Sequence, residues 1–303
     1  MKRRRRLFSI MLMLCFLISC SSFSAFAASG NYVKIPATVN YADAKEVLKL
    51  INVERTKRGL SKLKLDKSLN DSAVKRAAEL TVYVPETSPH KRPNGKSNRT
   101  INKKLIYECC AEGYETPKSV VLGWMSSPPH RKGILLSNAK SVGIGCLTSK
   151  NGFKYWTLEF GASTARKKVS NKGKISKTFK INAKSTYLKK KNFYLGVGGD
   201  HFDKYSQETE IEAGSITELF PYYENNYGMV TRLRPSDYIW SSGDTSVATV
   251  DSNGNVTAAK TGTVTIYAKM KDSLKYKLKV ELTITEPYIE DDDYYRHTIY
   301  VAD

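Results

Sequence analysis

The spacing of apolar residues in the first half of the chain predicts three helices. Apolar residues recur at steps of three and four from Tyr41 to Arg58 and from about Ser68 to Leu80, the period of a helix with one buried face. Gly59 follows the first of these segments, as a glycine at a helix C-terminus would. Thr116 before Pro117 is a favourable N-cap and first-turn pair, so a third helix is predicted from Pro117 through Trp124.

The segments 141–148 and 153–160 have the alternating pattern of strands, and the intervening Lys150-Asn151-Gly152 is a hairpin signal. Helices and strands therefore mix without the regular alternation of a parallel doubly wound sheet. The pattern favours an α+β domain of stacked layers.

The second half of the chain has a different pattern. Short alternating strands are predicted within residues 239–251, at 256–258 and at 264–268, with turns at 252–255 and 260–263. Short strands at regular intervals indicate an all-β sandwich. Trp240 is expected in or beside its core.

The N-terminus is typical of an export signal. Five consecutive basic residues, Lys2 to Arg6, precede an apolar run at residues 7–18 that is too short to span a membrane, and Ala25-Phe26-Ala27 fits a cleavage site. Residues 17–20 also resemble a bacterial lipobox, which would make Cys20 a lipid anchor. Either alternative predicts an extracellular or cell-surface protein without a transmembrane helix in the mature chain.

The formal net charge of the chain is +20, and removal of residues 1–27 takes away five positive charges and leaves +15. Residues 166–191 contain eleven Lys or Arg and no acid. This stretch predicts contact with polyanions such as teichoic acids or anionic lipid, with Lys189, Lys190 and Lys191 as candidates. Its apolar residues equally fit a solvated linker and an edge strand whose lysines prevent association.

Partners are expected among cell-envelope polymers, lipid, and host or surface proteins, and not among nucleic acids. The tail 286–303 is acidic, and it either folds back onto the basic stretch or stays disordered.

Three cysteines remain after export: Cys109, Cys110 and Cys146. In an oxidising compartment, one disulfide between Cys146 and Cys109 or Cys110 is expected, with one thiol left free. The alternative is three buried thiols, since spacing does not fix disulfide geometry.

His90, Glu108 and His130 are candidates for a metal or acid–base site, because separate loops could bring them to one cleft. His130 follows two prolines that restrict its approach. Ser126 and Ser127 precede it, but nothing marks either as a nucleophile, and no catalytic residue is assigned.

Five ordered blocks of the first half resemble the CAP superfamily, which groups cysteine-rich secretory, antigen 5 and pathogenesis-related proteins, here in its bacterial SCP-like branch. The blocks are Asn52-x-Glu54-Arg55, Leu65-Asp66-x-x-Leu69-x-x-x-Ala73, Trp124 to Arg131, Gly143-x-Gly145 and Tyr155 to Gly161. The resemblance implies a three-layer α–β–α sandwich with a surface cleft. It implies that His90, Glu108 and His130 match cleft positions that hold zinc in some members.

Two cleft positions depart from the family pattern, because Ser127 stands where a second glutamate is usual and Cys109 where an asparagine is usual. Two imidazoles and one carboxylate still form a zinc ligand set with an open position. The alternative is that both histidines are polar cleft residues held by backbone hydrogen bonds.

The run from Trp240 to Ala268 resembles a group 2 bacterial immunoglobulin-like domain, a type that serves as a spacer or adhesive module. The expected organisation is a signal peptide at 1–27, a CAP domain at 33–165, a basic linker or edge strand at 166–199, an immunoglobulin-like domain at 200–285 that could start as early as 172, and the acidic tail. This organisation favours an exported binding or adhesion protein. The alternative is a metal-assisted hydrolase that uses His90, Glu108 and His130.

Overall fold

Two regions of β-structure dominate the computed structural model, which describes residues 31–86, 90–197, 209–271 and 276–287. The predicted signal peptide and nearly all of the acidic tail lie outside these residues. The helices and strands are, in chain order, β1 (Tyr32–Asn40), α2 (Tyr41–Thr56), β2 (Lys64–Leu65), α3 (Lys67–Leu80), β3 (Leu105–Glu112), α4 (Pro117–Ser126), α5 (Pro128–Ile134), β4 (Ser141–Ser149), β5 (Lys154–Gly161), β6 (Lys174–Asn182), β7 (Phe193–Val197), β8 (Glu210–Glu212), β9 (Ile216–Glu224), β10 (Val230–Arg232), β11 (Tyr238–Ser242), β12 (Ala248–Val250), β13 (Asn255–Ala258), β14 (Gly262–Met270) and β15 (Lys277–Thr285).

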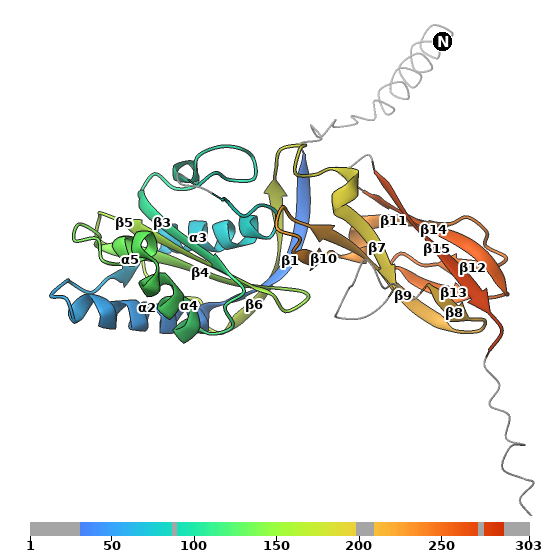
Figure 1. Cartoon of the computed structure of the whole chain (residues 1–303), viewed down its shortest axis with the longest axis horizontal. Helices are drawn as coiled ribbons and strands as arrows, with labels where there is room; N and C mark the ends of the chain where they lie inside the picture. Colours follow the sequence, from blue (N-terminus) through green and yellow to red (C-terminus); the bar gives the residue numbers. More distant parts are fainter. Residues whose placement is uncertain (1–30, 87–89, 198–208, 272–275, 288–303) are drawn as a thin grey trace, which may run out of the picture. The chain divides into compact units, whose positions relative to one another are not determined.

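The first region is a three-layer α–β–α sandwich (Figure 1). Its sheet has the order β3-β5-β4-β1-β6, and β2 pairs with β4. Helix α3 covers one face, while α2 and α4 cover the other. Alternation along β4 explains the layers: Ile144 and Cys146 join the apolar cluster of α2 and α4, whereas the two glycines beside them face α3. The predicted α+β sandwich is confirmed.

The two glycines of β4 permit the close packing of α3. A Cβ at Gly143 would lie 2.1 Å from the carbonyl carbon and oxygen of Leu69, and a Cβ at Gly145 would lie 2.3 Å from the oxygen of Ala73. Because both obstacles are backbone atoms of the helix, side-chain movement cannot relieve them. The Gly-x-Gly block is therefore a packing requirement of the helix–sheet interface.

The helix predictions match the structure closely, with one omission. Helix α2 is capped by Asn40, and Thr116 caps α4 in a capping box with Ser119. Residues 128–134, for which no helix was predicted, form the short helix α5, with Pro128 in its first turn. Proline is well tolerated there, since no intrahelical partner is needed for its missing N–H.

The second region is an immunoglobulin-like sandwich of two sheets, as predicted. One sheet has the order β10-β9-β13-β12 with β7 beside β9, and the other has the order β11-β14-β15-β8. Strand β15 alternates strictly between exposed and buried positions, with Leu278, Val280, Leu282 and Ile284 facing the core. Trp240 packs against this core while half-buried, and its Nε1 donates to the carbonyl oxygen of Pro235 at 3.0 Å.

The predicted linker at residues 166–199 contains two strands that belong to different sheets. Strand β6 pairs with β1 along the whole length of both strands and ends the first sheet. Strand β7 pairs with β9 in the second region. The apolar Phe179 and Ile181 of β6 are buried while its lysines are exposed, which fits the edge-strand alternative for this part of the stretch.

The two regions meet through direct contacts. The hydroxyl of Tyr223 in β9 donates to the carbonyl oxygen of Val82 at 3.1 Å, and one apolar cluster includes buried residues of both regions. Asn226, in the turn between β9 and β10, bonds to both the N–H and the carbonyl oxygen of Val84, at 2.9 and 3.0 Å.

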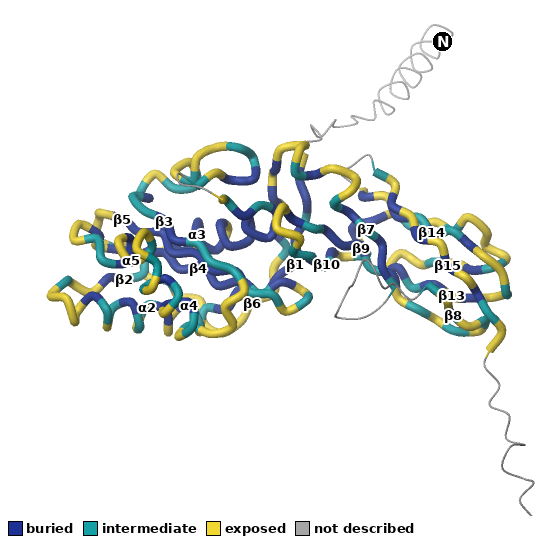
Figure 2. The backbone as a smooth tube through the Cα atoms, in the orientation of Figure 1, coloured by how far each residue is buried: buried dark blue, intermediate teal, exposed yellow. Residues whose placement is uncertain are grey.

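Buried residues are concentrated in α3, β4 and β1, as the colouring of the backbone in Figure 2 shows. No helix of the described residues is long and apolar enough to span a bilayer.

Candidate functional site

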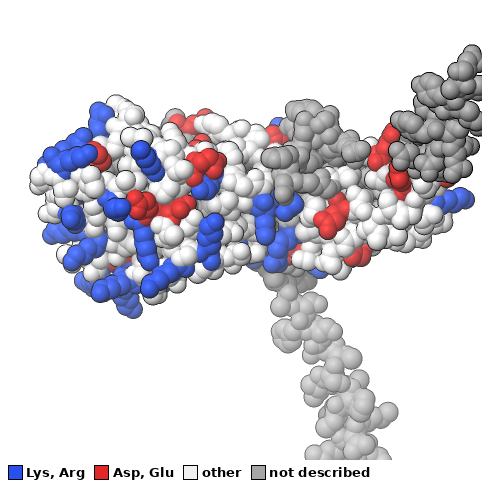
Figure 3. Space-filling model, turned by 90° about the horizontal axis from the view of Figure 1, so that it is seen from below, with Lys and Arg blue, Asp and Glu red and all other residues white. Residues whose placement is uncertain are grey.

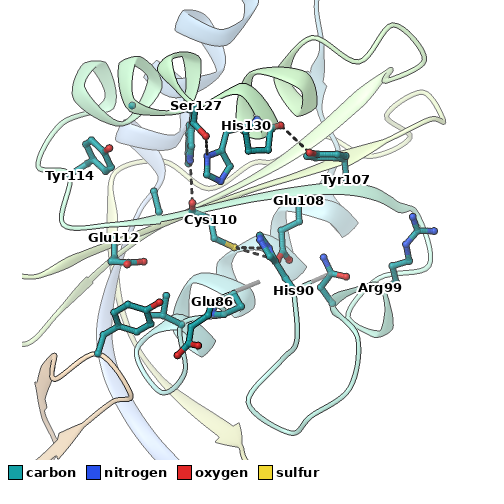
Figure 4. A pocket seen from close by; sticks show the side chains of 18 of the residues that line it. Glu86, His90, Arg99, Tyr107, Glu108, Cys110, Glu112, Tyr114, Ser127 and His130 are labelled. Atoms are coloured by element: carbon teal, nitrogen blue, oxygen red, sulfur yellow. Dashed lines mark hydrogen bonds and ion pairs between the residues drawn. The ribbon is translucent and has the colours of Figure 1, made fainter. Parts of the chain in front are cut away.

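A cavity of about 640 Å³ opens beside β3, which forms one edge of the first sheet. Its walls come from β3, the loop that carries His90, the α4–α5 junction, and the turn after β9. Figure 4 shows that His130 enters from the α4–α5 side and His90 from the loop, with Glu108 and Cys110 on the strand between them. The sequence-predicted residues His90, Glu108 and His130, with Ser127, all line this cavity.

Glu108 is a buried carboxylate in the floor of the cavity. Both of its oxygens accept from Arg76 Nε, at 3.2 and 3.3 Å, and Oε1 lies 2.8 Å from His90 Nδ1. Burial alone raises the pKa of Glu108, but the charge of Arg76 and the His90 hydrogen bond outweigh burial and lower it below the usual value. Glu108 is therefore ionised at neutral pH.

Arg76 is fully buried on α3 and belongs to a network of alternating charges. Its Nη1 lies 3.5 Å from Glu79 Oε2, and Glu79 also accepts from Arg92 Nε at 3.0 Å. The positive charges of Arg76 and Arg92 thus equal the negative charges of Glu79 and Glu108 in this network. Because each charge has a partner, the network fixes the orientation of Glu108.

His90 lies in a loop whose backbone is held on both sides of the residue. Its carbonyl oxygen accepts from the N–H of Asn98 at 3.0 Å. The carbonyl oxygen of the next residue, Lys91, accepts from Arg76 Nη2 at 3.2 Å. The guanidinium that orients Glu108 therefore also positions the loop that presents the imidazole.

His130 is positioned by α5 and points to the other side of the cavity. Its Nδ1 lies 3.0 Å from Ser127 Oγ, and the carbonyl oxygen of the preceding Pro129 accepts from the hydroxyl of Tyr107 at 2.9 Å. Burial, and to a smaller extent the charge of His90 across the cavity, lowers the pKa of His130. The ring is consequently neutral at pH 7.

Comparison with known families matches two segments of the chain in the expected order. Residues 48–160 match the model of the cysteine-rich secretory protein family, CAP, and residues 229–280 match the group 2 bacterial Ig-like domain. The first region is a CAP domain. The Ig-like match falls within the second sandwich.

Among curated proteins, the chain is 35% identical over 131 residues to the uncharacterized protein YkwD of Bacillus subtilis, and the match covers 41% of this chain. It spans about half of that relative, 49% of its length.

Two solved structures are similar at low identity. An outer surface protein from Borrelia burgdorferi is 22% identical with a TM-score of 0.36, covering 46% of this chain and 99% of that one. An extracellular protein with an SCP domain from Bacillus anthracis is 16% identical with a TM-score of 0.31, covering 40% and 41% of the two chains.

The disulfide expected between Cys146 and Cys109 or Cys110 is not formed, and all three thiols are free. The sheet order explains this correction. Strand β5 lies between β3, which carries Cys109 and Cys110, and β4, which carries Cys146. Two strand spacings amount to about 9.5 Å, well beyond the Cα separation that a disulfide spans.

The group of ligand atoms that the CAP cleft brings closest differs from the predicted set. Nδ1 or Nε2 of His90, a carboxylate oxygen of Glu108 and Sγ of Cys110 lie within 4.8 Å of one another. His130 is outside this group and bonds to Ser127 instead. The cause is α5, which holds His130 on the opposite side of the cavity from His90.

The cavity-lining residues Cys110, Glu112 and Tyr227 were not predicted as cleft residues, and neither was the role of the buried Arg76, which bonds to Glu108. Glu108, Cys110 and Glu112 lie two residues apart along one strand, so period-two alternation could have placed them on one face. Glu112 lines the cavity, and burial raises its pKa. Arg76 and Tyr227 carry no local signal, because only the tertiary fold brings α3 and the β9–β10 turn to β3.

Proposed function

We propose that this protein is exported and works at the bacterial cell envelope as a binding protein, attached to anionic polymers through a basic groove on its CAP domain. The basic segment, apolar run and cleavage pattern at residues 1–27 support export. The pairing of a domain of the secretory-protein family with a bacterial Ig-like domain supports a surface location. The charge of +15 left after removal of the signal supports a polyanionic partner.

The single observation that carries this proposal is a groove of about 910 Å³ between α3, the loop before β3 and the segment after β5. Six basic residues line the groove: Lys67, Lys75, Lys103, Lys104, Arg166 and Lys167. Its two acids are already neutralised, because Asp66 pairs with Lys104 at 3.0 Å and Asp71 pairs with Lys67 at 2.5 Å. The remaining basic residues leave the groove with a net positive charge.

The basic surface continues beyond this groove. An adjoining hollow shares Lys67 and Lys75 and adds Lys177 and Lys180 from β6. A groove bordered by lysines over this length suits an extended polymer whose phosphates recur along the chain. Figure 3 shows that Lys and Arg also predominate over the first domain on the face drawn there.

The fold divides the basic run of residues 166–191. Residues 166 and 167 line the groove and β6 borders it, whereas Lys190 and Lys191 lie beside Lys279 of the Ig-like domain. We therefore assign the main polyanion contact to the groove, and treat Lys189, Lys190 and Lys191 as a separate basic site.

The cleft chemistry favours binding over hydrolysis. Glu108 is neutralised by Arg76, so it is a poor general base. The Cys110 thiol donates to Glu108 Oε1 at 3.3 Å, and its burial beside that carboxylate raises the pKa of Cys110 well above its usual value, which opposes formation of a nucleophilic thiolate. Ser127 Oγ and His130 Nδ1 are hydrogen-bonded, but among the described residues no carboxylate bonds to the His130 ring, as the third member of a catalytic triad would.

Sedimentation with cell-wall fragments tests the proposal. Residues 31–303 should sediment with fragments that retain their phosphate polymers and should remain in solution when those polymers have been extracted. Binding should fall steeply as sodium chloride rises, because exposed charges are screened beyond about 10 Å at 0.1 M salt. Equal binding to intact and extracted fragments, or binding that is insensitive to salt, would overturn the proposal.

A further inference from the structure

We propose that Cys110, His90 and Glu108 form a binding site for one thiophilic divalent ion of the zinc class, with Cys110 as a thiolate ligand. The predicted zinc set contained the second imidazole, His130. The inference depends on the thiol of Cys110, two residues after Glu108.

The separations of the three ligand atoms fit one ion. His90 Nδ1 to Glu108 Oε1 is 2.8 Å, Cys110 Sγ to Glu108 Oε1 is 3.3 Å, and Cys110 Sγ to His90 Nδ1 is 3.8 Å. In a tetrahedral zinc site with bonds of about 2.0–2.1 Å to N and O and about 2.3 Å to S, neighbouring ligand atoms lie roughly 3.3–3.7 Å apart. The contact between His90 and Glu108 must lengthen by about half an ångström, and the contact between Cys110 and Glu108 by about 0.3 Å.

The ligands are also held in place before any ion binds. Glu108 and Cys110 lie on one face of β3, at positions two residues apart in a strand that is paired with β5. Arg76 Nε fixes the carboxylate, and Arg76 Nη2 fixes the loop at Lys91 beside His90. Such outer contacts orient the metal ligands and raise metal affinity.

The donor set selects the class of ion. A thiolate and an imidazole suit Zn²⁺ and related transition ions, whereas Mg²⁺ and Ca²⁺ prefer oxygen ligands. Three protein ligands leave a fourth position open to the cavity. His130 lies across that cavity, with its neutral ring bonded to Ser127.

The exchange of protons balances. The thiol of Cys110 releases its proton to solvent when the sulfur binds the ion. Before the ion binds, the ring of His90 carries a proton on Nδ1, which it donates to the ionised Glu108. On binding, this proton leaves Nδ1 through solvent, the neutral ring holds its proton on Nε2, and the Nδ1 lone pair binds the ion. The thiolate offsets one of the two charges of the ion, and because Glu108 and Glu79 already balance Arg76 and Arg92, the occupied site keeps one net positive charge.

Cobalt is a direct probe, because Co²⁺ occupies zinc sites and a thiolate–Co²⁺ bond absorbs in the near ultraviolet. Reduced residues 31–303 titrated with CoCl₂ should develop this absorption with a stoichiometry of one, and Zn²⁺ should abolish it. Cys110→Ser should lose the band and weaken Zn²⁺ binding by roughly tenfold or more. Cys109→Ala, which removes the neighbouring thiol on the opposite face of β3, should keep the band.

A second measurement uses the unaltered chain. Zn²⁺ should slow the alkylation of Cys110 by iodoacetamide, as read by peptide mass spectrometry, while Ca²⁺ should not. The proposal is overturned if Co²⁺ binds without the thiolate band, if the band survives in Cys110→Ser, or if Zn²⁺ leaves the alkylation of Cys110 unchanged. None of these outcomes bears on polymer binding by the groove, which is tested separately.

Discussion

At the scale of single residues, the least expected feature is a further buried carboxyl group next to Glu108. Glu159 of β5 lies directly across from Glu108 of β3 and is fully buried. Ser72 donates to its Oε2, while Oε1 has no hydrogen-bond partner among the described residues. Burial raises the pKa of Glu159 to about 8, so this group is mostly protonated at neutral pH.

This raised pKa predicts a fall in stability with rising pH. Between pH 4.5 and about 8 the unfolded chain has lost the Glu159 proton and the folded protein keeps it, so the free energy of unfolding decreases as pH rises. The decrease is on the order of 1 kcal/mol per pH unit within that window. Chemical denaturation of residues 31–303 at pH 5.5 and pH 8 measures the change.

Glu159→Gln should remove most of this decrease and be more stable than the parent at pH 8. Glu54→Gln is the control, because Glu54 is a surface carboxylate whose pKa is lowered by Arg58 and Lys57, so it is fully ionised across the same window. An unchanged pH dependence in Glu159→Gln would contradict the assignment of a buried, protonated carboxyl group.

Sequence reasoning reached His90, Glu108, His130 and Ser127, because each falls in a recognisable motif, and the structure brings all four to one cavity. It did not reach Arg76 or the contact between Cys110 and His90. Those depend on the pairing of β3 with β5 and on the packing of α3, and local patterns carry no information on either.

At the scale of elements, the packing of α3 on the sheet depends on the absence of a side chain at Gly143 and at Gly145 in β4. Gly143→Ala would place a methyl group 2.1 Å from the backbone of Leu69, so α3 must move away from the sheet. We expect a loss of roughly 3 kcal/mol or more in the free energy of unfolding, larger than the usual 1–3 kcal/mol for overpacking because the obstacle is backbone.

Gly59→Ala is the matched control for this prediction. Gly59 has a φ of +71° but no atom within 4 Å of an added Cβ, so only backbone strain of about 1 kcal/mol applies. Urea denaturation of both variants separates packing from strain. Equal losses in the two variants would contradict the close approach of α3.

Elements with strong local signals were predicted within a few residues, as α3 and β4 illustrate. Helix α5 was missed because two prolines indicate a turn as readily as a first helical turn. Strand β6 was seen only as an alternative to a basic linker, because its exposed lysines obscure the two buried residues that dock it on β1.

At the scale of the whole molecule, the two domains are more closely joined than separate sequence blocks suggest. Tyr223, Asn225 and Asn226 of the Ig-like domain bond to backbone atoms between Leu80 and Val84 of the CAP domain. The same turn presents Tyr227 to the cleft. The Ig-like domain therefore supports one wall of the CAP cavity.

This contact predicts how fragments should behave. Residues 31–166 lack β6, which pairs with β1 along its whole length, and should be markedly less stable than residues 31–183. Both should unfold at lower temperature than residues 31–303, because they expose the shared apolar cluster. Scanning calorimetry of the three chains tests this, and equal transition temperatures for residues 31–166 and 31–303 would contradict it.

The most direct test of the central claim compares two variants of equal charge. Lys75→Gln/Lys103→Gln/Lys167→Gln changes the groove, and Lys189→Gln/Lys190→Gln/Lys191→Gln changes the separate basic site by the same three charges; all six lysines are exposed. The measurement is the affinity of residues 31–303 for a wall phosphate polymer as a function of salt. The groove variant should bind roughly tenfold or more weakly with a shallower salt dependence, and the other should stay near the parent. Equal weakening of both variants, or full binding by the groove variant, would contradict the claim.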